Sequence, residues 1–201
     1  MKAQLSIKFI ASYLAIFVAT VWVFYNIDSR WMEAITAQTS SYVLGLFGHT
    51  TRWWVEGFYT FLYLNGQNPV TVNIIRECTA LNVLGVMTGL ILPLRASFTN
   101  RILGVILSGV LLFAMNIPRI MLTIYLTAYD TWPFTTLANR NLETYHYPIS
   151  FAFGVIGVAI TVLTVTKLAT PELGNTLLDL TDKITSLIQK PKPTIARNET
   201  S

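Results

Sequence analysis

Long apolar runs separated by short polar segments dominate the hydrophobic pattern of this chain. A helix crosses a bilayer core of about 30 Å with about 17 to 25 mainly apolar residues. Four runs approach or exceed that length, at residues 9–25, 74–94, 102–129 and 147–166. We therefore predict an all-α fold, a polytopic membrane helix bundle with about four to six transmembrane or re-entrant helices.

Residues 26–73, between the first two runs, carry too many charges to cross a membrane cleanly and too many aromatic rings for an ordinary loop. Aromatic side chains collect where lipid meets water. We therefore predict interfacial helices that lie on the outer face of the bundle. Two alternatives stay open for this segment, a hidden fifth crossing near residues 42–64 and a re-entrant hairpin.

Residues 171–201 are predicted to follow a membrane domain of residues 1–170 as a cytoplasmic tail. Leucine and isoleucine recur at helical spacing from Leu173 to Ile188, with lysine on the other side. This pattern is typical of an amphipathic helix. Beyond Pro191 we predict disorder.

Composition strengthens the membrane interpretation. Hydrophobic residues make up 53% of the 201 residues and charged residues 12%, against about 25% charged residues in typical soluble domains. No large soluble domain and no nucleic-acid partner are expected. The single cysteine excludes an internal disulfide, and the 2 histidines are too few for a standard zinc site. We therefore expect no metal site and no cofactor.

Basic residues set the predicted orientation, because short cytoplasmic loops are enriched in lysine and arginine. With the N-terminus in the cytoplasm, nine of the 14 basic residues fall on the cytoplasmic side and five fall on or near the outer side. Both termini are therefore predicted to be cytoplasmic, in a multi-pass protein of the plasma membrane.

Three reactive side chains fall at one depth in this topology. Cys78 stands where the second run enters from the outer side, Arg119 lies near the outer end of the third, and His146 directly precedes the fourth. An arginine in an apolar run is costly, so it is expected to face the bundle interior with a partner. Pro118 beside it removes a backbone hydrogen bond and is expected to kink the helix, which opens space for a site.

These residue types together favour acyl transfer at an extracytoplasmic site. A thiolate at Cys78 would attack a peptide carbonyl, His146 would take the thiol proton and return one to the leaving amine, and Arg119 would stabilise the oxyanion. Asn116, one turn before Arg119, is expected to orient that arginine or the substrate carbonyl. Further supporting or alternative groups are Glu77, Glu143 as a partner that fixes the tautomer of His146, and the cations of Arg76 and Arg140.

Each of the three main residues also has a non-catalytic interpretation. A lone cysteine in a membrane protein is commonly an inert packing residue. An arginine can extend to lipid headgroups, and a histidine between two tyrosines suits the membrane interface. The competing hypothesis is therefore a small non-catalytic subunit of a membrane protein complex.

The motifs around these residues resemble those of the exosortase and archaeosortase family of membrane cysteine transpeptidases. Glu77-Cys78-Thr79-Ala80-Leu81 is similar to the family's cysteine motif, and Asn116-Ile117-Pro118-Arg119 is similar to its Asn-x-x-Arg motif. His146 matches the third basic position, for which Arg140 competes because many archaeosortases have arginine there. The resemblance covers about residues 74–165.

The resemblance implies a cysteine transpeptidase with Cys78, Arg119 and His146 as its catalytic residues. It implies exported protein substrates, each with a C-terminal sorting signal made of a short motif, a hydrophobic helix and a basic tail. Cleavage is expected outside the cytoplasm, with transfer to an acceptor at the cell surface. The substrate helix is expected to dock from the lipid bilayer, in a groove between spans beneath the aromatic segment.

Overall fold

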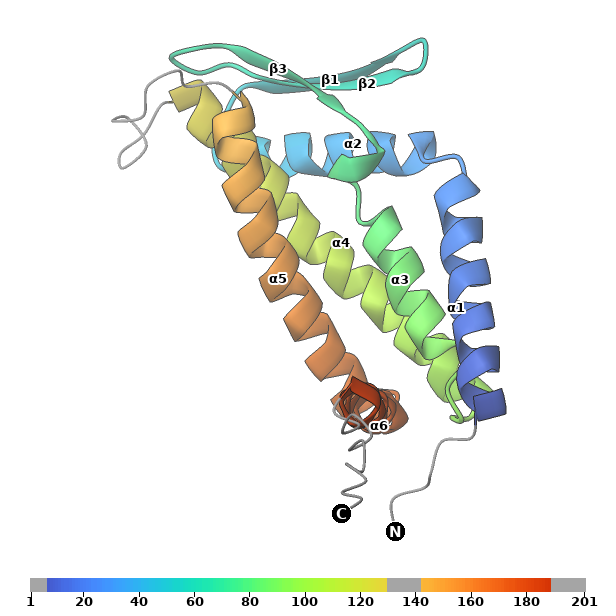
Figure 1. Cartoon of the computed structure of the whole chain (residues 1–201). Helices are drawn as coiled ribbons and strands as arrows, with labels where there is room; N and C mark the ends of the chain where they lie inside the picture. Colours follow the sequence, from blue (N-terminus) through green and yellow to red (C-terminus); the bar gives the residue numbers. More distant parts are fainter. Residues whose placement is uncertain (1–6, 130–141, 189–201) are drawn as a thin grey trace, which may run out of the picture.

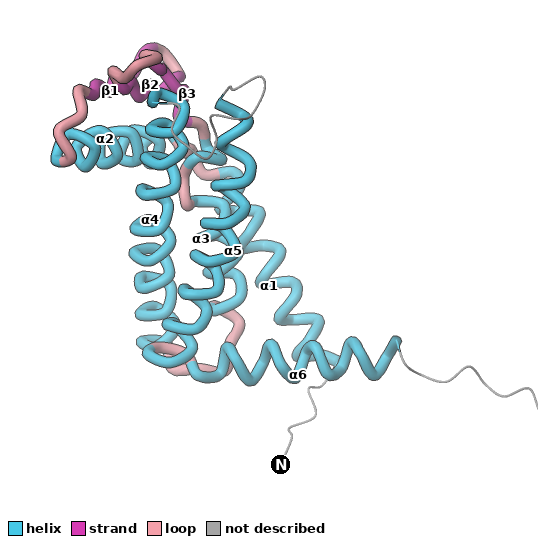
Figure 2. Tube along the Cα trace, turned by 90° about the vertical axis from the view of Figure 1, so that its left-hand side faces the viewer, coloured by secondary structure: helices cyan, strands magenta, loops and turns pink. Residues whose placement is uncertain are grey.

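The computed structural model describes residues 7–129 and 142–188 as a helix bundle with one end covered by a further helix and a small sheet (Figure 1). The elements in chain order are α1 (Ile7–Asn26), α2 (Arg30–Leu46), β1 (Thr51–Glu56), β2 (Tyr59–Leu64), β3 (Val70–Ile74), η1 (Arg76–Cys78), α3 (Leu81–Ile91), α4 (Phe98–Tyr129), α5 (Leu142–Leu168) and α6 (Pro171–Ile188). We call the end that carries α2 and the sheet the covered end. The amphipathic helix expected after the last span corresponds to α6, which lies across the opposite end (Figure 2).

Within the described residues, three helices are long and apolar enough to cross a membrane, at Lys8–Asn26, Phe98–Tyr129 and Leu142–Leu168. The predicted polytopic helix bundle is therefore confirmed. All three of these helices begin before the apolar runs that predicted them. At the start of α4, the Ser97 hydroxyl accepts a hydrogen bond from the backbone N–H of Asn100 at 3.2 Å, and such capping extends a helix into a polar stretch.

The second predicted span is only partly helical. The run at residues 74–94 begins with the end of β3 and the 3-10 turn η1, and the helix α3 covers Leu81–Ile91 alone. The segment still follows α1 along its length, since Arg76 hydrogen-bonds to the backbone of Ile27 at one end and the Arg95 guanidinium lies over the Phe9 ring at the other. The polar pair Arg76 and Glu77 explains why the helix starts late.

The segment predicted as interfacial helices is half helix and half sheet. α2 lies across the bundle end, but the residues after it form an antiparallel sheet in the order β1-β2-β3. Buried Thr60, Leu62 and Leu64 alternate with more exposed residues along β2, and this period of two suits a strand. Gly57, at φ 60°, permits the tight turn between β1 and β2. The all-α prediction thus missed one small sheet.

The alternatives for the same segment are also resolved. β1 and β2 occupy most of residues 42–64, so no helix of the described chain crosses the membrane there. The two strands pair in register from Thr51 with Leu64 to Glu56 with Tyr59. They form a hairpin over α2 at the covered end, outside the bundle of long helices (Figure 1).

The sheet is fixed to the end of α4. Leu62, Leu64 and Ile74 are almost fully buried and pack in one apolar cluster with Ile120 and Ile124. The backbone N–H of Asn68 donates to the carbonyl of Ala128 at 2.9 Å. Gly66 allows this approach, because a Cβ there would lie 2.8 Å from the Ala128 oxygen. The β3 strand and the turn after it are consequently held next to α4.

Candidate active site

A cavity of about 370 Å³ lies at the covered end of the bundle. Its walls come from β3 and the turn that follows, from the second half of α4, and from the first turns of α5. The three predicted catalytic residues, Cys78, Arg119 and His146, all line this cavity, together with Glu77 and Glu143. The fold therefore brings together side chains from three separate elements, in agreement with the common depth in the membrane that the topology predicted for them.

Cys78 is held at the end of a hydrogen-bonded turn. Its backbone N–H donates to the Ile75 carbonyl at 2.8 Å. The Thr79 hydroxyl donates to the Arg76 carbonyl at 2.7 Å and accepts from the backbone N–H of Leu81 at 3.3 Å. These bonds fix the half-buried thiol directly before the first turn of α3.

Asn116 supports this turn from α4. Its side chain is 7% exposed, and its Nδ2 donates to the carbonyl of Cys78 at 2.8 Å. No hydrogen bond joins Asn116 to Arg119 among the described residues, and the amide instead binds the backbone carbonyl of Cys78. The alternative role of Asn116, to orient a substrate carbonyl, stays a prediction. A buried amide that satisfies a backbone carbonyl is costly to remove, so Asn116 stabilises the turn that carries Cys78.

Arg119 bridges the turn and α5. Its Nη2 donates to the Glu77 carbonyl and its Nη1 donates to the Ser150 hydroxyl, both at 3.3 Å. Its Nε is buried and has no hydrogen-bond partner among the described residues. The guanidinium thus lies beside the cavity with donor capacity to spare. Pro118, the expected site of a kink, lies inside a helix that is assigned without a break.

Ser150 was not among the residues predicted for the site. It stands four residues after His146 in α5, and residues at that spacing share one helix face. This spacing could have identified Ser150 from the sequence. A hydroxyl on the same helix face as His146 is a candidate hydrogen-bond acceptor for Arg119.

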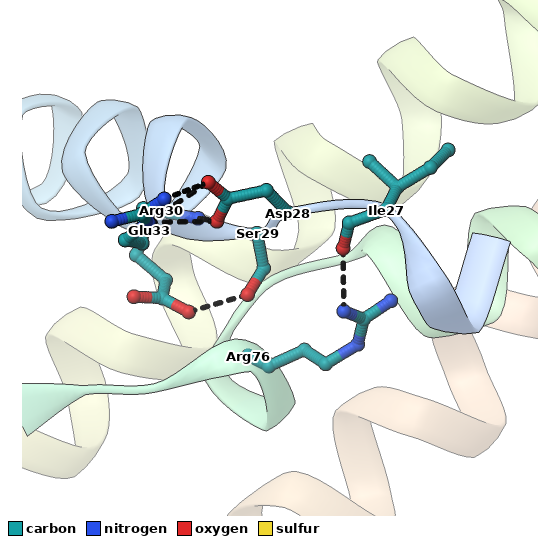
Figure 3. A network of polar contacts seen from close by, with 6 residues as sticks. All are labelled: Ile27, Asp28, Ser29, Arg30, Glu33 and Arg76. Carbon is teal, nitrogen blue, oxygen red and sulfur yellow. Dashed lines mark hydrogen bonds and ion pairs between the residues drawn. The ribbon is translucent and has the colours of Figure 1, made fainter. Parts of the chain in front are cut away.

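Arg76 points away from the cavity and holds the turn to α1. Its Nη1 donates to the Ile27 carbonyl at 2.8 Å (Figure 3), its Nη2 donates to the Phe24 carbonyl, and its Nε donates to Asn82 Oδ1 at 2.8 Å. These carbonyls belong to the last turn of α1 and the residue after it, where helices leave backbone acceptors unpaired. Arg76 is therefore an anchor, and the structure does not support it as an alternative cation for the thiol.

His146 and Glu143 lie in the first two turns of α5 and line the cavity. In this described helix no hydrogen bond joins the two side chains, so the proposed fixing of the histidine tautomer by Glu143 is not seen. The His146 ring instead meets the Tyr147 ring edge-on, with 5.6 Å between centroids. Arg140, the alternative third cation, lies outside the described residues.

Burial raises the pKa of the Cys78 thiol above its ordinary value, and the positive charge of Arg119 acts in the opposite direction. A thiol reacts as its thiolate. Near neutral pH this thiol is therefore protonated, and it needs a base to ionise it before attack. His146 on the same cavity is the candidate base.

The rate of Cys78 alkylation should reveal this balance. Because the thiolate fraction grows as pH approaches the pKa, the alkylation rate is expected to rise with pH and to level off only above the pKa of an unperturbed cysteine. In Arg119→Gln the profile should move to higher pH, because the lowering influence of the cation is gone. The measurement is iodoacetamide labelling of the detergent-solubilised protein across pH, which reports one thiol because the chain has 1 cysteine. A shift of the alkylation profile to lower pH in Arg119→Gln would contradict the conclusion that the Arg119 cation lowers the pKa of Cys78.

Comparison with known families decides the class of this protein. The family described as Transmembrane exosortase (Exosortase_EpsH) matches residues 3–137. The chain belongs to the transmembrane exosortase family. The matched region of this exosortase-family chain includes Cys78, Asn116 and Arg119 and ends before His146. No curated protein and no solved structure matches the chain. Family membership and the apolar helices establish a membrane protein.

Proposed function

We propose that this exosortase-family chain is a cysteine transpeptidase. It cleaves the C-terminal sorting signals of exported proteins on the extracytoplasmic side of the membrane and transfers them to a surface acceptor. The observation that carries the proposal is that Cys78, Arg119 and His146 line one and the same cavity. Family membership supports it.

The proposed reaction has two halves. In the first, His146 takes the proton from the Cys78 sulfur, the sulfur bonds to the substrate carbonyl carbon, and Arg119 stabilises the resulting oxyanion. The carbon–nitrogen bond then breaks, and His146 gives its proton to the leaving amine. In the second half, a nucleophile of the acceptor attacks the thioester carbonyl and transfers its proton to His146. The carbon–sulfur bond then breaks, and His146 returns the proton to the departing sulfur of Cys78.

A second, smaller cavity of about 90 Å³ supports lateral entry of the hydrophobic helix of the substrate. It lies between α3, α4 and α5. Glu77 and Arg119 line both cavities, and Asn116 lines the smaller one. Gly154 of α5 belongs to its wall, and a Cβ there would meet nothing within 4 Å. The cavity has room for a side chain, so a substrate helix that packs against α3 and α5 from the bilayer would insert one here and would present the peptide above it to Arg119 and the thiol.

The proposed thioester gives the test of the function. When the protein is co-expressed with a protein that carries a short motif, an apolar helix and a basic tail, a covalent adduct with the N-terminal part of that protein is expected. The adduct should break on treatment with hydroxylamine, which attacks thioesters. The measurement is an immunoblot for both chains after denaturing electrophoresis. Processing without any thioester adduct, also when the acceptor is depleted, would contradict a cysteine mechanism.

The alternative function, a non-catalytic subunit of a membrane complex, predicts a different result. Such a subunit would co-purify with its partners and would leave the sorting signal intact, with no adduct. The proposed location is tested by labelling intact cells with a membrane-impermeant thiol reagent. Cys78 should react from outside, and labelling only after cell lysis would place the site on the wrong side of the membrane.

A further inference from the structure

β3 is an edge strand beside the candidate active site. The sheet order is β1-β2-β3, and within the described residues β3 pairs only with β2. An unpaired strand edge exposes backbone donors and acceptors and is a template for another strand. The chain continues from β3 through η1 to Cys78, so this edge leads to the thiol.

The cavity runs along the edge of β3. Its wall includes four consecutive residues, Val72, Asn73, Ile74 and Ile75. Successive side chains of a strand point to opposite faces of the sheet. A cavity over one face would therefore touch every second residue, whereas a cavity beside the backbone touches them all.

The hydrogen-bond alternation shows which backbone groups face the cavity side. The backbone N–H of Asn65 donates to the Thr50 carbonyl at 2.9 Å. The backbone N–H and C=O groups of the odd-numbered residues in β2 therefore point toward β1. Antiparallel ladders alternate, so Thr60, Leu62 and Leu64 face β3, where their register partners are Ile74, Val72 and Val70.

Thr71 and Asn73 consequently direct their backbone N–H and C=O groups away from β2. The hydrogen bonds that the described residues make outside the sheet include none to the backbone of either residue. Both residues are exposed, whereas Val72 and Ile74 between and after them are buried. Among the described residues, this edge therefore presents unpaired backbone groups at a two-residue repeat, on a strand that the core holds in place.

We propose that the Thr71–Asn73 edge of β3 binds the substrate residues that precede the cleaved bond, which add to the sheet as an extra strand. This inference rests on the proposed function. Main-chain hydrogen bonds supply affinity in this mode of recognition, and alternate side chains supply specificity. Because the acyl part of the substrate must end at Cys78, the added strand runs in the same direction as β3. The apolar wall formed by Ile120, Ile124 and Leu142 receives the side chains that point into the cavity.

A binding assay in a protein without the nucleophile tests this inference apart from the chemistry. The protein is Cys78→Ala in detergent, and the probe is a fluorescent peptide that covers the residues before the apolar helix of a processed protein. Single backbone N-methylations are introduced along the peptide. Methylation at alternate residues should weaken binding about three- to tenfold, and methylation at the residues between them should have little effect. Equal effects at every position, or none at any, would overturn the proposal.

A matched pair of proline variants tests the strand itself. Asn73→Pro removes an outward N–H beside the cavity, and Val55→Pro removes an outward N–H on β1, the opposite edge, which does not line the cavity. Proline is tolerated at such edge positions. Asn73→Pro should lose about three- to tenfold in peptide affinity, whereas Val55→Pro should bind like the parent. Equal binding by the two proline variants would contradict the inference. If Asn73→Pro does not fold, the N-methyl series decides, because it leaves the protein unchanged.

Failure of this inference and failure of the proposed function have different signatures. If the wild-type protein forms the thioester adduct but the N-methyl series on Cys78→Ala shows no alternation, the proposed function stands and the docking strand is refuted. If the wild-type protein forms no adduct, the cysteine mechanism is refuted, and the reason to expect a substrate strand at β3 is refuted with it.

Discussion

Cys78→Ala is expected to abolish processing of a co-expressed sorting-signal protein, with a fall of at least about 1,000-fold in rate. The substitution removes the sulfur that would form the acyl intermediate of the proposed reaction. The fold should survive, because backbone hydrogen bonds and the Asn116 amide hold the turn. The measurement is the fraction of substrate that is cleaved, followed by immunoblot over time.

Two further variants make this result specific. Cys78→Ser keeps the size of the side chain but replaces a thiol with a far less acidic hydroxyl, so it should lose almost as much activity. Cys78→Ala should also abolish the hydroxylamine-sensitive adduct while the protein reaches the membrane in normal amount. Unchanged cleavage in Cys78→Ala would leave the non-catalytic subunit as the better interpretation.

His146→Gln is expected to lower the rate of processing by about 100- to 10,000-fold, the range for loss of a general acid–base group. The reason is the protonated state of the buried thiol, which leaves attack dependent on a neighbouring base. The loss should be smaller at high pH, where part of the thiol ionises without help. The measurement is the single-turnover rate of adduct formation as a function of pH.

Arg140→Gln is the matched comparison, since Arg140 is the alternative third residue in the sequence. With His146 as the base, Arg140→Gln should stay within about threefold of the wild type, because the proposed proton transfers then do not involve Arg140. A large loss in Arg140→Gln together with a mild loss in His146→Gln would transfer the role to the arginine.

The gathering of Cys78, Arg119 and His146 was predictable because charge in an apolar run is rare. The cost of placing Arg119 within a long apolar helix marks it as an interior residue, and the three apolar runs fix which end each residue occupies. Those facts depend only on the order of polar and apolar residues, so they are readable without a structure.

The supporting contacts were not predictable in the same way. Asn116 and the Cys78 carbonyl are 38 residues apart, and Arg76 binds backbone carbonyls that every sequence contains. No periodicity reports such contacts. The sheet did leave a signal, the two-residue alternation in residues 59–64 next to Gly57, but the aromatic content of this stretch suits an interface equally well.

The shortness of α3 has a consequence for the surrounding lipid. Its 11 residues give an apolar cylinder of about 16 Å, little more than half of a hydrocarbon core of about 30 Å. A bilayer meets such hydrophobic mismatch by thinning locally. Thinning beside α3 would bring headgroups and water to the level of Cys78. In the proposed function, this would expose the extended residues of the substrate that directly precede its hydrophobic helix.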